Sequence, residues 1–154
     1  MIALFLIISL GQPSPVFGRE TVVWVQGRNL GAYKLAAQKV ELVWKVVSAK
    51  HEHESAGFLG GVPGKLKSRI SYMLLRSPVG FKPLPRSAYS DWSDVTSISL
   101  AVSKGLPVEM RILGGDAGES FEVKLLFKNG ELVERRVYSA EDPKTLYEKT
   151  FYSG

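Results

Sequence analysis

Two histidines separated by one residue are the side chains of this sequence whose spacing most directly suggests metal chemistry. His51 and His53 alternate with Glu52 and Glu54, so on a β-strand both imidazoles would point to the same side. The zinc-protease pattern His-Glu-x-x-His is not met, because Ser55 stands where its second histidine is required. The pair therefore suggests a metal or catalytic site completed by a carboxylate. The competing interpretation is a solvated strand end.

Other catalytic motifs are absent or incomplete. Gly64-Lys65 resembles the end of a phosphate-binding loop, but Leu66 lacks the hydroxyl that would bind magnesium. No Gly-x-Ser-x-Gly pattern marks a hydrolase nucleophile. The chain contains no cysteine, which excludes disulfides, thiolate nucleophiles and cysteine-ligated zinc or iron–sulfur clusters. We therefore expect no cofactor, and the sequence favours binding over catalysis.

A stretch without acidic residues runs from Ser55 to Ser90 and combines cations with aromatic side chains. On a strand, Lys65, Lys67 and Arg69 would line one face, which suits phosphate or sulfate groups. The alternative is a solvated strand face whose cations only keep the protein soluble. The candidate binding residues are Lys65, Lys67, Arg69, Arg76, Lys82 and Arg86, interleaved with Tyr72 and Phe81.

The formal net charge of +5 is unevenly distributed along the 154 residues. Residues 19–104 carry thirteen basic and six acidic residues, whereas residues 105–154 carry seven basic and nine acidic residues. An anionic polymer, lipid headgroups or an acidic protein would complement the basic half. A basic groove with stacking aromatics would also suit nucleic acid. The first eighteen residues resemble an export signal, which argues against nucleic acid as the partner.

The first eighteen residues differ from the rest of the chain. An uncharged apolar run spans residues 2–10, and two prolines follow it. Val16 and Gly18 are small residues at positions −3 and −1 of a cut before Arg19, which is typical of a signal peptide. The run lacks the basic residues that normally precede it, so a buried N-terminal strand or helix is the alternative. We expect a signal peptide over residues 1–18 and a secreted or periplasmic mature protein.

Residues 19–154 are expected to form a single β-rich domain, because their length suits one domain and their apolar residues mostly alternate. This pattern predicts a mainly β fold, an antiparallel β-sandwich or meander with long loops. Asn129-Gly130 between two alternating runs is typical of a type I′ hairpin. We expect the meander to run from Asp94 to the end, with residues 146–152 as its closing edge strand. No apolar run is long enough for a membrane-spanning helix.

The segment from Leu30 to Lys50 is ambiguous. Its second half alternates as a strand over about residues 39–49, while Ala36-Ala37 favours a short helical or irregular stretch before it. The alternative is one helix over about residues 31–48 packed on an antiparallel sheet, which would make the fold α+β. Residues 51–65 and 77–92 are expected to be long loops.

Three functions are consistent with these patterns. The first is an exported, non-catalytic binding domain that contacts anionic or protein partners through the basic region 57–86. The second is a metal-binding protein or enzyme that uses His51 and His53 with a carboxylate. The third is a structural component of a cell-envelope assembly, which would offer edge strands to its neighbours.

Overall fold

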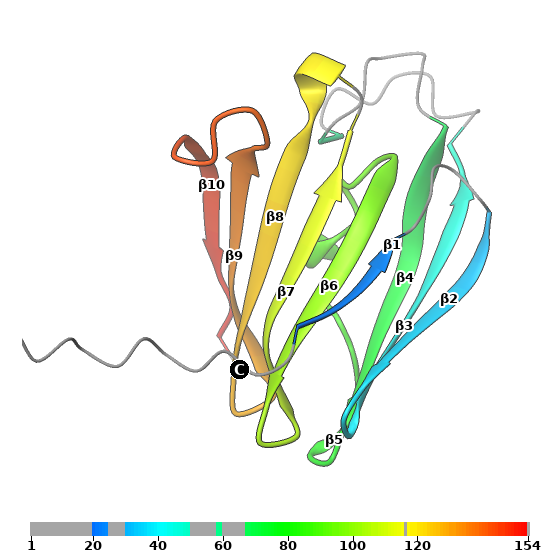
Figure 1. Cartoon of the computed structure of the whole chain (residues 1–154), viewed down its shortest axis with the longest axis vertical. Helices are drawn as coiled ribbons and strands as arrows, with labels where there is room; N and C mark the ends of the chain where they lie inside the picture. The colour runs from blue at the N-terminus through cyan, green and yellow to red at the C-terminus, as the bar shows by residue number, and fades with distance from the viewer. Residues whose placement is uncertain (1–19, 25–29, 50–57, 60–66, 116, 154) are drawn as a thin grey trace, which may run out of the picture.

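The computed structural model describes residues 20–24, 30–49, 58–59, 67–115 and 117–153, which form two antiparallel sheets (Figure 1). The larger sheet has six strands in the order β1-β6-β7-β8-β9-β10. The smaller sheet has four strands in the order β2-β3-β4-β5. The mainly β prediction is confirmed. The strands of the larger sheet are β1 (Glu20–Trp24), β6 (Val95–Ser103), β7 (Leu106–Gly114), β8 (Phe121–Lys128), β9 (Glu131–Ser139) and β10 (Leu146–Phe151), and those of the smaller sheet are β2 (Gly31–Ala37), β3 (Val40–Ser48), β4 (Ser68–Ser77) and β5 (Gly80–Pro83).

One hydrophobic core lies between the two sheets. Each strand alternates, so one set of side chains points inward and the other set faces outward. The inward set of the smaller sheet includes Trp44 and Met73, and that of the larger sheet includes Ile98, Ile112 and Leu125. The strand β1 pairs with β6 and also lies beside β2, so the sheets approach each other at this edge.

The helical alternatives for residues 31–48 are wrong. Residues 31–37 form β2, which pairs with β3 along its whole length, and the strand predicted over about 39–49 is β3. Tyr33 stacks on Trp44 at 5.5 Å between ring centroids, and Leu35 points into the core. Pairing with a buried neighbouring strand therefore outweighs the helical propensity of the two alanines. Gln38, at φ 53°, makes the tight turn between the strands.

The loop predicted over residues 77–92 contains regular structure. Its first part forms β5, a four-residue edge strand that ends at Pro83, and a short 3-10 helix follows at Arg86–Ala88. Proline is tolerated at the edge of a sheet, which explains why the strand was missed. Ala88, Tyr89 and Trp92 are buried, so the segment also contributes side chains to the core. Within the described ranges no helix is long and apolar enough to cross a membrane.

Several expectations fall outside the described residues. These are the signal peptide over residues 1–18 and nearly all of the loop over residues 51–65. The meander is confirmed, since β6 to β10 are consecutive neighbours and β10 is an edge strand. A second 3-10 helix, Ala117–Glu119, lies between β7 and β8.

Four hairpin turns meet at one end of the molecule, which is the lower end in Figure 1. They are residues 38–39, 78–79, 104–105 and 129–130, and we call this region the hairpin end. The turns touch one another: a Cβ on Gly105 would lie 3.8 Å from the Lys39 side chain and 3.9 Å from Pro78. A Cβ on Gly130 would lie 2.7 Å from the Val79 side chain.

Replacing Gly130 with alanine is expected to lower the free energy of unfolding by about 2 kcal/mol. Gly130 has φ +83°, and the added methyl would overlap Val79. Gly118→Ala is the matched control, because nothing lies within 4 Å of a Cβ there, and its stability should stay within about 0.5 kcal/mol. Urea unfolding measures both variants. If Gly130→Ala were as stable as Gly118→Ala, the turn would not require glycine at position 130.

Candidate functional site

The outward side chains of the smaller sheet form a surface rich in cations and apolar groups. Cross-strand pairing brings Lys45 beside Tyr72, and it places Arg76 between Glu41 and Phe81. Lys34 pairs with Val43, which in turn pairs with Leu74. We call this surface the basic face, and it consists of Lys34, Glu41, Val43, Lys45, Arg69, Tyr72, Leu74, Arg76 and Phe81.

A β-bulge in β4 decides which of its side chains reach the basic face. The register shifts between Lys45 and Val46, so Ser71 is an extra residue without a partner across the strand pair. Its hydroxyl donates to the Lys45 carbonyl at 3.3 Å. Because of this extra residue, Ile70 and Met73 both point into the core although they are three positions apart. Tyr72 is thereby turned outward.

Cations outnumber carboxylates on the basic face. Glu41 is its one acidic residue among those described, and it contacts the Lys34 ammonium at 2.5 Å and the Arg76 guanidinium at 3.7 Å. The hydrogen bond from Lys34 holds the pKa of Glu41 below its usual value. Lys45 and Arg69 add two further positive charges to the same face. The face therefore carries a positive potential beyond what Glu41 neutralises.

Two aromatic rings lie among these cations. The Phe81 side chain is 54% exposed, and the Arg76 guanidinium lies 5.4 Å from the centre of its ring. This distance is that of a cation–π contact, which keeps the guanidinium beside the ring. Tyr72 is partly buried beside Lys45. The arrangement offers flat apolar surface next to exposed charge.

The outer face of the larger sheet differs, because its charges pair with one another. Glu122 contacts Arg111 at 2.8 Å and Lys124 at 3.4 Å. Glu134 contacts Arg136 and also lies 3.3 Å from Lys149. The hydrogen bond from Arg136 lowers the pKa of Glu134. Acids and bases alternate on this face, whereas cations dominate the basic face.

The structure separates the other residues singled out from the sequence. Lys82 lies on the opposite side of β5, and its ammonium contacts Glu131 of β9. Arg86 begins the 3-10 helix, and Lys67 is an exposed residue just before β4. Arg69, Tyr72, Arg76 and Phe81 share the basic face, whereas Lys65, His51 and His53 lie outside the described residues.

Sequence reasoning missed the contribution of Lys34 and Lys45 to the basic face. Lys34 sits on β2, where a helical turn was expected, so its alternation with Tyr33 and Leu35 was not recognised. Lys45 was assigned to a strand, but the position of that strand beside β4 depends on long-range pairing. The alternation of charged and apolar residues over 31–37 is the signal that could have identified Lys34.

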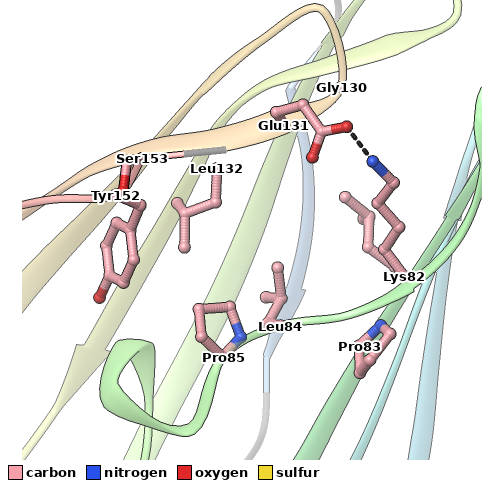
Figure 2. A pocket seen from close by; sticks show the side chains of 10 residues that line it. Lys82, Pro83, Leu84, Pro85, Gly130, Glu131, Leu132, Tyr152 and Ser153 are labelled. Atoms are coloured by element: carbon pink, nitrogen blue, oxygen red, sulfur yellow. Dashed lines mark hydrogen bonds and ion pairs between the residues drawn. The ribbon is translucent and has the colours of Figure 1, made fainter.

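A pocket of about 220 Å³ lies between β5 and the start of β9, next to the hairpin end (Figure 2). Figure 2 shows Leu84, Pro85 and Leu132 on its walls, with the Tyr152 ring at one side. The Lys82–Glu131 ion pair stands at the other side. The lining is mainly apolar, so the pocket suits an apolar group better than an ion.

A charge cluster centred on a buried arginine lies where β9 pairs with β10. The Arg135 side chain is 5% exposed, and its guanidinium contacts the Asp91 carboxylate and the Glu148 carboxylate, the latter at 2.8 Å. It also donates to the Ser87 carbonyl at 3.5 Å. Burial raises the pKa of Asp91, and the positive charge of Arg135 opposes that rise. The cluster fastens the segment between β5 and β6 to the larger sheet.

Among the described residues, no group of three or more acidic or histidine side chains is placed to hold a metal ion. Comparisons of the chain with protein families, with curated proteins and with solved structures found no match. Any statement about function therefore depends on the geometry and charge described above.

Proposed function

We propose that this protein is an exported, non-catalytic binding domain that contacts an anionic partner through the basic face. The observation that supports it most is the charge of that face, on which four cations, Lys34, Lys45, Arg69 and Arg76, accompany one described carboxylate, that of Glu41. The export element of the proposal comes from the apolar residues 1–18, which lie outside the described residues.

Anion binding by such a face follows from its geometry. The four cations lie on three neighbouring strands and none is the direct cross-strand partner of another, so they are spread over the face and would contact separate sulfate or phosphate groups of a polymer. Tyr72 and Phe81 add apolar surface that a sugar ring or an aliphatic segment would cover. Because the side chains are exposed, binding should weaken strongly as the salt concentration rises.

The proposal is tested with heparin as a soluble sulfated polymer. In the variant Lys45→Gln with Arg76→Gln, heparin affinity at low salt should fall about tenfold, since two contacts of roughly 0.5–1 kcal/mol each are lost. Both side chains are exposed, and Glu41 keeps its contact with Lys34. Calorimetric titration provides the affinity, and urea unfolding checks that the variant still folds.

The matched control is Lys144→Gln with Lys149→Gln, which removes the same charge elsewhere on the surface. We expect it to change heparin affinity less than twofold. An equal loss in both variants would mean that overall charge, and not the basic face, attracts the polymer. Unchanged heparin affinity in the Lys45→Gln, Arg76→Gln variant would show that the basic face does not bind the polymer.

The edge strand β10 offers less support for a structural role in an assembly. Its pairing is interrupted by a bulge at Tyr147, and Lys149 places a charge on the strand. Bulges and edge lysines are features by which natural sheets avoid pairing with other chains. The exposed side chains of Leu146, Tyr147 and Phe151 favour a structural role in an assembly.

A further inference from the structure

The hairpin end carries three exposed lysines. Lys39 and Lys104 lie within two of its turns, and Lys128 immediately precedes a third. All three side chains are exposed, and none of them forms an ion pair with any residue that the structure describes. By contrast, the nearby Lys82 is paired with Glu131. Glu131 lies opposite Lys128 across the β8–β9 hairpin but pairs with Lys82, so the hairpin end presents net positive charge toward solvent.

The fourth turn of the hairpin end presents exposed apolar side chains instead. Val79 is 52% exposed at the tip of the β4–β5 hairpin, and Phe81 follows it on β5. Val79 also rests against the Asn129-Gly130 turn, so the tip is held in place by its neighbour. Val79 and Phe81 lie two residues apart on this hairpin, so a partner that reaches its tip would bury apolar surface that is now exposed.

We propose that the hairpin end docks onto the surface of an anionic lipid bilayer. Val79 and Phe81 would enter the headgroup region, while Lys39, Lys104 and Lys128 would contact lipid phosphates around them. This combination of apolar side chains and surrounding lysines matches the layered chemistry of a membrane surface, where apolar burial and attraction to anionic headgroups act together.

A bilayer accounts for more of the hairpin end than other anionic partners do. A soluble polyanion that covers Phe81 on the basic face would still leave Val79 exposed at the hairpin tip. A free phosphate would need side chains that converge on one point, whereas these lysines come from three separate turns. The four turns lie at the same end of the two sheets (Figure 1), so they can reach one plane together.

The surface goes beyond the proposed function, because it is distinct from the basic face. Lys45 and Arg69 lie toward the middle and far end of the smaller sheet, while Lys39, Lys104 and Lys128 belong to turns. Phe81 is the one residue that both surfaces share. Variants confined to the turn lysines therefore test the hairpin end alone.

Sedimentation with lipid vesicles tests the proposal. We expect the full chain to bind vesicles of phosphatidylcholine mixed with phosphatidylglycerol and to bind pure phosphatidylcholine vesicles much more weakly. The variant Lys39→Gln, Lys104→Gln, Lys128→Gln should bind the anionic vesicles about 100-fold more weakly, at about fivefold per lysine. The variant Val79→Ser with Phe81→Ser should also lose affinity, by about tenfold or more.

The control removes two lysines from the larger sheet and one from its β9–β10 loop instead, as Lys124→Gln, Lys149→Gln and Lys144→Gln, and it should bind anionic vesicles within about threefold of the original chain. If the control loses as much affinity for anionic vesicles as the Lys39→Gln, Lys104→Gln, Lys128→Gln variant, the proposal is overturned, because nonspecific charge attraction then explains the binding. Equal binding to both kinds of vesicle would overturn it as well. Competition by soluble glycerol phosphate at millimolar concentration would point to a single phosphate site instead of a bilayer.

The vesicle and heparin experiments test the two proposals independently of each other. If the bilayer proposal is wrong, the Lys39→Gln, Lys104→Gln, Lys128→Gln variant keeps its affinity for the anionic vesicles, whatever its affinity for heparin. If the basic face does not bind anions, the Lys45→Gln, Arg76→Gln variant keeps its heparin affinity, whatever its affinity for vesicles. Capture of a protein partner by the turns, with no vesicle binding, would also overturn the bilayer proposal.

Discussion

Replacing Arg135 with methionine is expected to lower the free energy of unfolding by about 3–5 kcal/mol at neutral pH. The guanidinium is buried and stands between the carboxylates of Asp91 and Glu148. Methionine fills much of the same volume but leaves Asp91 charged, partly buried and without its cation. Removing one partner of a buried ion pair costs far more than removing an exposed pair, because the remaining charge has little water around it.

Urea unfolding at pH 7 measures this loss. Lys82→Met is the control, since Lys82 and Glu131 form an ion pair with both side chains about half exposed, and its loss should stay below about 1 kcal/mol. If Arg135→Met costs no more than the control, the cluster does not hold the segment between β5 and β6. The double variant Asp91→Asn with Arg135→Met should recover part of the lost stability, because the uncompensated charge is gone.

The size of the Arg135 effect should depend on pH. Burial already raises the folded-state pKa of Asp91 above its ordinary value of 3.8, and Arg135 opposes the rise. Without Arg135 the folded pKa of Asp91 rises further. A raised acid pKa means that stability is fully present below the unfolded pKa and is lost as pH rises through the folded pKa. The difference between the original chain and the variant is therefore largest at neutral pH and shrinks as pH falls toward 3.8.

Replacing Asp94 with alanine is expected to cost about 3 kcal/mol of stability. Asp94 is 7% exposed, and its Oδ1 accepts the Ser68 backbone N–H at 2.9 Å and the Ser68 hydroxyl at 3.1 Å. Ser68 begins β4 and Asp94 precedes β6, so these bonds tie one sheet to the other. Alanine would leave a buried N–H without its acceptor, and at φ 46° it would lack the short polar side chain that makes this conformation tolerable for aspartate.

Asp94→Asn is the matched variant. Asparagine keeps an oxygen acceptor at the same position and tolerates a positive φ, so we expect it to lose about 1 kcal/mol or less. Thermal or urea unfolding of both variants separates the hydrogen bonds from the charge. Equal losses for alanine and asparagine would show that the negative charge, and not the acceptor geometry, stabilises the contact between the sheets.

Local patterns in the sequence were sufficient for the strands whose signals are contained within a few residues. Asn129-Gly130 lies between two alternating runs, and the structure has positive φ at both positions, as a type I′ turn requires. The meander from β6 to β10 followed from the same alternation, and two of its hairpins are closed by the two-residue turns at 104–105 and 129–130. The backbone conformation at these positions depends mainly on neighbouring residues.

Part of the basic face could also be anticipated. Arg69 and Arg76 were singled out by their acid-free surroundings, and both reach the same surface of the smaller sheet. Lys82 was singled out for the same reason, yet it points away and pairs with Glu131. The bulge at Ser71, which turns Tyr72 outward, depends on how β3 and β4 align. A sequence window cannot show that alignment.

By itself the sequence determined the β character, the tight turns and the uneven charge, because alternation, turn chemistry and composition act over short distances. Only the tertiary structure decided that residues 31–37 are a strand and that four turns meet at one end. It also placed Arg135 in the interior between two carboxylates. These features depend on which distant strands pair and which faces become buried, and that choice is made by the free energy of the whole core.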